Sequence, residues 1–134
     1  MAWHLNSSPT DIDRPLLVGI VNITSDSFSD GGRFLATADA LSHAQKLRSA
    51  GADIIELGPA ASHPGARQVA AAEEIRRLTG VLDRLVAEGV PVCVDSFLPE
   101  TQRFAVAHGA AYINDIQGFS DPAQYGELAD ATCR

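Results

Sequence analysis

The sequence lacks the features that would place this chain in a membrane, on nucleic acid or in a disulfide framework. No apolar run approaches the roughly 18 residues that a membrane-spanning helix needs. The ten lysines and arginines are scattered along 134 residues and the net charge is −7, which argues against nucleic acid as a partner. The two cysteines, Cys93 and Cys133, lie far apart without metal-ligand spacing. These absences favour a soluble protein of the reducing cytoplasm.

Signatures of secretion and of several common catalytic sites are missing as well. Residues 1–15 have neither a basic segment nor an apolar core, so we expect a surface lead-in rather than a signal peptide. No G-x-S-x-G nucleophile elbow, G-x-x-x-x-G-K phosphate loop or dinucleotide fingerprint occurs. The pattern of secondary structure therefore has to carry the interpretation.

The chain does contain a repeated unit of apolar run, loop and helix. Hydrophobic residues make up 46% of the sequence, which fits an α/β protein and excludes disorder. Thr37 is the predicted cap of the first helix, and Pro99 suits the first turn of the third. Strands are predicted at residues 16–22, 54–57, 90–94 and 110–114, helices at 37–50, 75–86, 99–108 and 123–131, and helix-closing glycines at Gly51, Gly89 and Gly109.

Strands that alternate with helices predict a parallel sheet with right-handed crossovers. Four such units fit either a small doubly wound domain or half of an eight-unit (β/α) barrel, because a complete barrel needs about 250 residues. Composition alone favours the small domain. The first strand is apolar throughout, which is typical of a strand covered on both faces.

Each predicted strand ends in a polar residue. Asn22, Glu56, Asp95 and Asn114 hold these positions, with Asp115 directly after the last. The C-terminal ends of parallel strands are where (β/α) barrels keep their chemistry, so four such residues predict a binding mouth. A carboxylate and an amide at neighbouring strand ends suit a nitrogen-rich ring between them.

Each of these residues also has a structural interpretation. Asp95, with Ser96 beside it, could cap the next helix. Glu56 could be a paired structural charge or a contact to a loop, and Asp115 could tie down the loop that follows it. For each of these residues taken alone, the structural interpretation is favoured. Taken together, the residues favour a binding mouth.

Two long loops follow the first two strands. Residues 23–35 are rich in serine, aspartate and glycine. Phe28 is the only aromatic residue of the segment 19–32, and Gly31-Gly32 is a pair that would let a lid move. Residues 58–69 carry Ser62 and His63 between prolines. His63 has no evident metal or triad partner and is interpreted as a solvated histidine.

Three segments together resemble the dihydropteroate synthase family. They are GIVNITSDSFSDGG at residues 19–32, VDSFLPE at 94–100 and YINDIQGF at 112–119, and the resemblance runs from about residue 16 to the end. The family condenses 6-hydroxymethyl-7,8-dihydropterin diphosphate with p-aminobenzoate in folate biosynthesis, uses Mg²⁺ and releases pyrophosphate. The resemblance implies a transferase with the (β/α)₈ TIM-barrel fold.

The resemblance also implies roles for single residues. Asn22 would bind the Mg²⁺–diphosphate group, while Asp95 and Asn114 would hold the edge of the pterin; Asn22 and Asp95 are thus the candidate catalytic residues. Glu56 stands where the family usually has Asp and would contribute to substrate binding. Loops 24–32 and 60–65 would close over p-aminobenzoate, with Thr24, Asp26, Phe28 and Ser62 as the substrate-binding candidates.

The second loop departs from the family pattern. It is GPAASHPGA where the family usually has G-G-E-S-T-R-P-G, so His63 replaces the usual arginine. This loop, together with NDIQGF, is closer to the sulfonamide-resistant branch of the family, and sulfonamide resistance is a hypothesis that follows.

Length is the larger departure. The family's later strands supply an Asp, a Lys, an Arg and a His to the substrates, and the sequence ends at Arg134. Residues 16–134 are therefore predicted to form the N-terminal half of the barrel, about four βα units, without activity of its own. Half a barrel has two exposed sheet edges, so self-association or a homodimer is expected.

Three rival interpretations stay open at this point. A pterin-binding methyltransferase-type barrel shares the Asp and Asn at the strand ends, although the DSFSDGG loop argues against it. A non-catalytic fragment could fold or oligomerise without binding anything. A small flavodoxin-like module would need the fourth unit to complete an open sheet.

Overall fold

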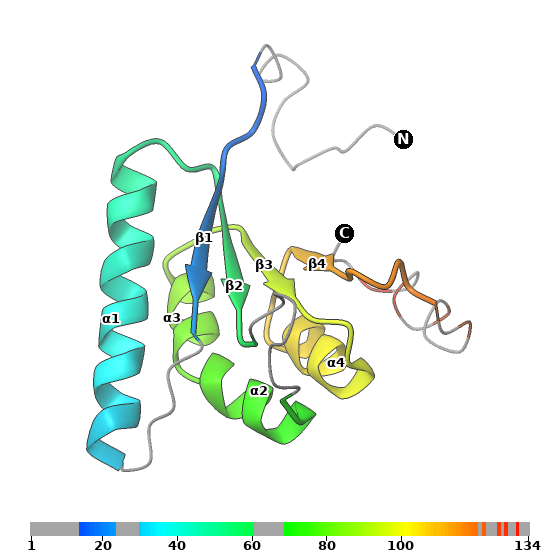
Figure 1. The fold of residues 1–134 in the computed structure, drawn as a ribbon. Helices are drawn as coiled ribbons and strands as arrows, with labels where there is room; N and C mark the ends of the chain where they lie inside the picture. The colour runs from blue at the N-terminus through cyan, green and yellow to red at the C-terminus, as the bar shows by residue number, and fades with distance from the viewer. Residues whose placement is uncertain are drawn as a thin grey trace.

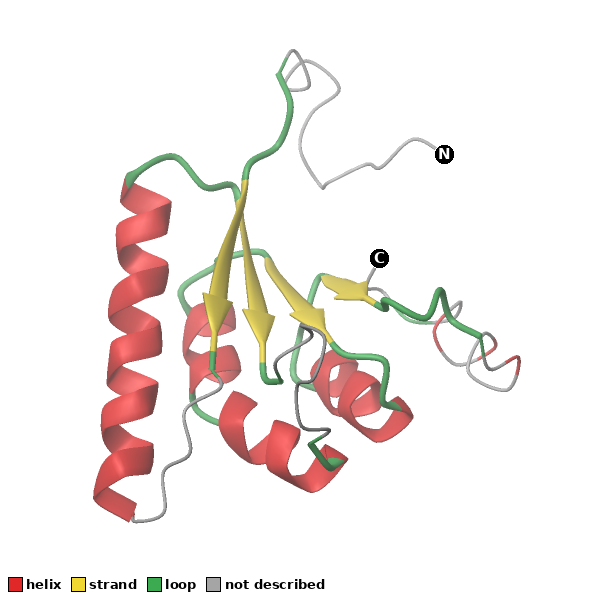
Figure 2. Cartoon of the chain, viewed as in Figure 1, coloured by secondary structure: helices red, strands yellow, loops and turns green. Residues whose placement is uncertain are grey.

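The computed structural model describes residues 14–23, 30–60 and 69–120, together with residues 122, 126, 128 and 131. It is an α/β structure in which four parallel strands alternate with helices (Figures 1 and 2). Most of the predicted lead-in at 1–15 and of the predicted helix at 123–131 lies outside the described residues. No helix in the described ranges is long and apolar enough to cross a membrane. The strands are β1 (Val18–Asn22), β2 (Ile54–Gly58), β3 (Val92–Asp95) and β4 (Tyr112–Asn114), and the helices are α1 (Asp30–Ser49), α2 (Ala71–Leu78), α3 (Val81–Ala87) and α4 (Pro99–Ala107).

The sheet follows the chain, with strand order β1-β2-β3-β4 and parallel pairing throughout. The four helices cover one face of the sheet, and the buried core lies between the sheet and the helices. Every second strand residue points into this core, and the helices contribute one apolar stripe each. The core includes Val21, Ile55, Leu57, Val92, Val94 and Ile113 from the strands and Ala44, Leu78, Leu82, Leu85 and Ala105 from the helices.

The opposite face of the sheet is open at β1. Val18 and Ile20 are 49% and 53% exposed, whereas Gly19 and Val21 between and beside them are buried. The expectation that this strand is covered on both faces was therefore wrong for the described structure. The apolar alternate positions instead match the interior of a barrel, which bulky branched side chains fill.

Two helix predictions need correction. The first helix begins at Asp30, seven residues before the predicted cap Thr37. The predicted single helix over 75–86 is two helices, because Thr79 ends α2 and Gly80 adopts φ 89° before α3 begins. Pro99 does lie in the first turn of α4. The predicted closing glycines are confirmed by positive φ at Gly51, Gly89 and Gly109.

An ion pair fixes the entry to β1. Arg14 Nη2 and Nη1 lie 2.6 and 2.8 Å from the two oxygens of Asp53, and the main-chain N–H of Leu17 also donates to Asp53 at 2.8 Å. The Arg14 hydrogen bond is the main reason why the pKa of Asp53 falls to about 2, with the Leu17 bond second. This contact links the start of β1 to the residue that precedes β2, and so helps to set their register.

Candidate functional site

Four positions form one layer at the C-terminal edge of the sheet, where the strand arrows end in Figure 2. Asn22 is level with Gly58 on β2, and Asp95 is level with Asn114 on β4. Leu57 pairs with Val94 in the β2–β3 register, so Gly58 and Asp95 are the next residues along these two strands. Asn22 and Asn114 are exposed and Asp95 is half-buried. The structure thus brings three of the predicted site residues together on one edge.

Glu56 lies one layer deeper, which corrects the expectation that all four polar residues share one level. β2 continues past it to Gly58, so Glu56 pairs with Ile20 and Cys93. Its Oε1 accepts a hydrogen bond from Asn114 Nδ2 at 3.1 Å and lies 3.6 Å from Cys93 Sγ. Glu56 therefore supports the layer above it.

Gly58 leaves room for the Asn22 side chain. A Cβ atom at position 58 would come within 2.9 Å of Asn22 Oδ1. A larger residue there would displace the Asn22 amide, because 2.9 Å is closer than a carbon and an oxygen pack. A glycine at this point of β2 thus opens one side of the mouth.

The Asp95 carboxyl group has an unusual environment. Its pKa is raised to about 6, first by burial and then by the negative charges of Glu56, Glu74 and Asp115. Burial and the three negative charges all disfavour the ionised form, and no cation among the described residues opposes them. A half-buried carboxylate without a cationic partner is a strong acceptor for N–H donors from a ligand.

The capping interpretation of Asp95 was wrong. Helix α4 has Leu98 at its N-cap position and no side-chain cap bond within the described structure. Ser96 Oγ instead accepts the main-chain N–H of Leu98 at 3.1 Å. Asp115, by contrast, does tie down the loop after β4, because its Oδ1 accepts the main-chain N–H of Gln117 at 2.8 Å.

A buried polar network behind the mouth escaped the sequence interpretation. Glu74 and Gln102 are 4% and 1% exposed, and Ser96 between them is buried. Ser96 Oγ donates to Glu74 Oε1 at 2.5 Å, and Gln102 Nε2 donates to the main-chain oxygen of Ser96 at 2.8 Å. The sequence did contain one signal for this network. Gln102 lies three positions before Ala105, on the core side of α4, and a polar side chain that is buried there requires hydrogen-bond partners.

Several predicted residues cannot be placed. Thr24, Asp26, Phe28 and Ser62 lie outside the described residues, as does His63. Of the predicted set, the structure describes Asn22, Glu56, Asp95 and Asn114, and residues 24–29 and 61–68 lie outside the described ranges.

The oxygen donors at the mouth suit a partly hydrated Mg²⁺ rather than a metal enclosed by protein ligands. No group of three or more His, Cys, Asp or Glu in the described ranges could hold a metal ion. Asn22 offers one exposed amide oxygen at the strand end. One neutral oxygen fits Mg²⁺, which usually keeps several waters and takes its other ligands from substrate phosphates. It does not fit a metal that needs a complete set of protein ligands.

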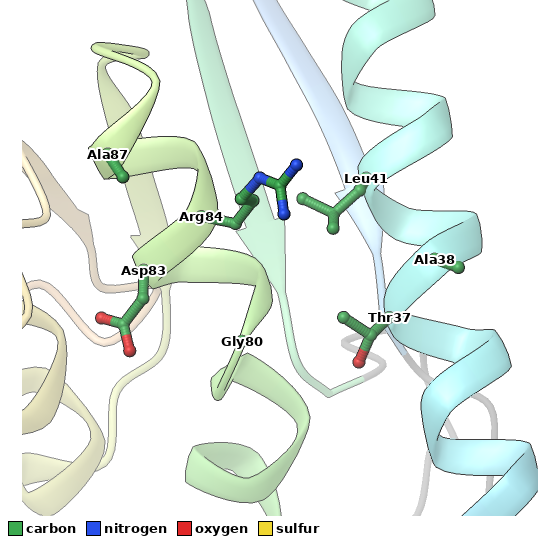
Figure 3. A pocket seen from close by; sticks show the side chains of 7 residues that line it. All are labelled: Thr37, Ala38, Leu41, Gly80, Asp83, Arg84 and Ala87. Atoms are coloured by element: carbon green, nitrogen blue, oxygen red, sulfur yellow. The ribbon is translucent and has the colours of Figure 1, made fainter.

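A separate pocket lies between α1 and α3, on the helical layer rather than at the strand ends (Figure 3). Its volume is about 470 Å³, and its charged residues already have partners. Arg84 pairs with Glu88 at 3.0 Å, and Asp83 pairs with His108 at 2.7 Å. This pocket offers no free charged group to a ligand. It is lined by Thr37, Ala38, Leu41, Gly80, Asp83, Arg84 and Ala87.

Comparison with known proteins identifies the relatives of this chain. The family model described as pterin binding enzyme matches residues 18–134. A dihydropteroate synthase type-2 from Escherichia coli is 53% identical over 119 residues, which are 89% of this chain and 44% of that protein. The chain thus spans less than half the length of this relative.

Solved structures agree with the fold. A dihydropteroate synthase from Xanthomonas albilineans with 4-aminobenzoic acid superposes with a TM-score of 0.77 at 45% identity, over 88% of this chain and 44% of that one. The enzyme from Anaplasma phagocytophilum with bound 6-hydroxymethylpterin-monophosphate gives a TM-score of 0.81 at 36% identity, over 89% and 46%. The four parallel strands and the helices between them therefore match roughly half of the barrel in these structures, and the doubly wound alternative was wrong.

Proposed function

We propose, because this chain belongs to the pterin-binding enzyme family, that it carries the pterin half-site of a dihydropteroate synthase of folate biosynthesis. The observation that carries the proposal is the layer at the sheet edge, where Asp95 and Asn114 stand level on neighbouring strands. The reaction proposed for the whole protein joins 6-hydroxymethyl-7,8-dihydropterin diphosphate to p-aminobenzoate and releases pyrophosphate. Because the chain spans 44% of its type-2 relative, we expect no turnover from these residues alone.

Asp95 and Asn114 would bind the pterin through complementary hydrogen bonds. An ionised carboxylate accepts two N–H donors, which a pterin presents side by side on its pyrimidine ring. An asparagine amide supplies one donor and one acceptor group for the adjoining edge. With a pKa of about 6, Asp95 is mostly ionised at neutral pH and becomes protonated under mild acid. Pterin affinity should therefore fall as the pH is lowered through 6.

Asn22 would act on the diphosphate. Mg²⁺, when bound, would neutralise charge on the departing pyrophosphate. The Asn22 amide oxygen would help to fix the position of that group at the end of β1, beside the pterin. The remaining work of the site is to orient the pterin carbon and the p-aminobenzoate amine so that the C–O bond breaks and the C–N bond forms. Thr24, Asp26, Phe28 and Ser62 remain predicted contacts of p-aminobenzoate, and Glu56 remains a predicted substrate-binding residue.

Calorimetric titration with the pterin diphosphate and Mg²⁺ tests the proposal. The wild-type chain should bind saturably, and Asp95→Ala should abolish binding. Asp39→Ala is the matched control, since Asp39 is an exposed carboxylate on α1. Absence of heat from soluble, folded wild-type protein would favour the non-catalytic fragment instead. In a protein completed by the other half of the barrel, p-aminobenzoate-dependent release of pyrophosphate separates the synthase from a methyltransferase-type barrel.

Three expectations from the sequence remain proposals. Self-association is supported by the exposed apolar side chains on the open face of the sheet. Sulfonamide resistance is supported by the similarity to the type-2 relative, and a normal sulfonamide inhibition constant in an intact enzyme carrying this sequence would reject it. A cytoplasmic location is supported by folate biosynthesis as the proposed pathway, and recovery of the protein in the cytoplasmic fraction of its host tests it.

A further inference from the structure

Gln102 connects the two strand ends that carry Asp95 and Asn114. It lies on α4 and is 1% exposed. Its Nε2 donates hydrogen bonds to the main-chain oxygen of Ser96 at 2.8 Å and to Asp115 Oδ2 at 3.0 Å. Ser96 directly follows Asp95, and Asp115 directly follows Asn114. One buried amide group therefore bridges the residues that come next after the two candidate pterin ligands.

Both partners of this bridge are themselves held in place. The second oxygen of Asp115 accepts the main-chain N–H of Gln117 at 2.8 Å, so each carboxylate oxygen has a donor. Ser96 Oγ donates to Glu74 at 2.5 Å and accepts from the main-chain N–H of Leu98 at 3.1 Å. The bridge is thus anchored on α2 as well as on α4. Hydrogen bonds at buried positions of this kind are stronger than in water and fix one arrangement.

Apart from the hydrogen bond of Asn114 to Glu56, β4 has few other restraints at this end. It is three residues long and pairs only with β3 in the described sheet. The main-chain N–H of Ser96 donates to the oxygen of Asn114 at 3.0 Å and continues the pairing one step beyond Asp95. A short edge strand is easily displaced, so a side-chain bridge at its end has a large share in its position.

We propose that Gln102 is a positioning residue for the pterin site: its amide sets the spacing between the Asp95 carboxylate and the Asn114 amide. It does so by holding the residue that follows each of them. The inference rests on the proposed function, because it assigns Gln102 a task in the same site. A side chain that only satisfied buried polar atoms would stabilise the fold and leave the affinity of the folded protein unchanged.

The test compares two neighbouring buried positions. Gln102→Met keeps the side-chain length and removes both donors. Thr101→Val is the matched control, because Thr101 is 0% exposed and its Oγ1 has no hydrogen-bond partner among the described residues. In titrations with pterin diphosphate and Mg²⁺, corrected for the folded fraction, Gln102→Met should raise Kd about tenfold and Thr101→Val less than about twofold. Equal affinities of the two folded variants overturn the proposal.

Hydrogen exchange separates this proposal from the proposed function. The main-chain N–H groups of Ser96 and Gln117 report on the two strand ends without any ligand, because they bond to Asn114 and Asp115. Exchange at both should accelerate about tenfold in Gln102→Met and stay unchanged in Thr101→Val. If the wild-type chain binds no pterin but exchange accelerates, the proposed function fails and the control of the strand ends by Gln102 stands. Unchanged exchange in Gln102→Met overturns the positioning role in either case.

Discussion

Asn114 Nδ2 donates a hydrogen bond to Glu56 Oε1 at 3.1 Å across the intervening strand β3. The same Glu56 carboxylate raises the pKa of Asp95, the register partner of Asn114. One deeper residue therefore acts on both candidate pterin ligands, on one by a hydrogen bond and on the other by its charge.

Glu56→Gln should move the pH dependence of pterin binding to lower pH. Gln keeps an oxygen that accepts from Asn114, but it removes a negative charge that disfavours ionisation of Asp95. Burial, the largest cause, is unaffected, so we expect the pKa of Asp95 to fall only part of the way from about 6 towards its ordinary value. The affinity for pterin diphosphate, measured by calorimetry from pH 5 to 8, would report the midpoint. Glu100→Gln on the exposed side of α4 is the control, and a midpoint that stays or rises in Glu56→Gln contradicts the prediction.

Asp95→Asn should stabilise the protein in neutral and alkaline solution. The pKa of Asp95 is higher in the folded chain, about 6, than in the unfolded one, so the folded state binds more protons between pH 4 and 6. Stability contributed by this group is thus present below the unfolded pKa and is lost as the pH rises through 6. The half-exposed carboxylate limits the gain from Asn to about 1 kcal/mol at pH 8. Urea unfolding at pH 8 and pH 4 measures it, and an equal gain at both pH values would speak against the charge as its source.

Two glycine substitutions should separate binding from stability. Gly58→Ala displaces only the far end of the Asn22 side chain, so we expect little loss of stability and a weaker Mg²⁺-dependent affinity for the diphosphate. Gly19→Ala meets Leu47 at 3.0 Å and Ala52 at 3.1 Å on the helical side, which should cost about 1–3 kcal/mol without affecting Asn22. Titration with the pterin diphosphate and with the pterin lacking phosphate, alongside urea unfolding, gives both quantities. If Gly58→Ala weakens both ligands equally, Asn22 has no specific task at the diphosphate.

Cys93 should be almost inert in the folded protein. It is 8% exposed, and the pKa of its thiol is raised, first by burial and then by Glu56. The thiolate that reacts with iodoacetamide is therefore scarce and shielded. In a Cys133→Ser background, alkylation at pH 8 should be at least about 100-fold slower than in concentrated urea. If Cys93 in the folded protein were alkylated nearly as fast as a free thiol standard, the sheet around β3 would have to open readily.

The sequence was sufficient to predict where the strands end, but not that one apolar stripe belongs to two separate helices. Asn22, Asp95 and Asn114 stand out because a polar residue after an apolar run marks where a strand leaves the core. The spacing of Leu78, Leu82 and Leu85 predicts one helix, since periodicity reports which face is buried and not whether the axis is continuous. Both α2 and α3 pack on the same core, so the apolar stripe continues across the break between them. The break is recognised only in the structure, where Gly80 has a positive φ.

The depth of Glu56 and the bridge by Gln102 were beyond the sequence for a different reason. Strand register decides that Glu56 is level with Ile20 instead of Asn22, and register depends on pairing between segments distant in the chain. Gln102 bonds to Ser96 and Asp115, six and thirteen positions away, through a side chain. Local patterns contain no information on such pairs until the strands and α4 are placed together.

Self-association should depend on the open face of the sheet. Ile20 is 53% exposed there, whereas Leu17 is 55% exposed but precedes the first residue of β1. Of these two similarly exposed apolar residues, only Ile20 belongs to the open face of the strand and should join copies. β1 and β4, each with a strand on one side only in the described sheet, leave backbone donors and acceptors for the same contact. Sedimentation velocity over a range of concentrations should show a smaller associated fraction for Ile20→Lys than for Leu17→Lys. Equal effects of the two substitutions would mean that general hydrophobicity, and not the barrel-interior face, drives association.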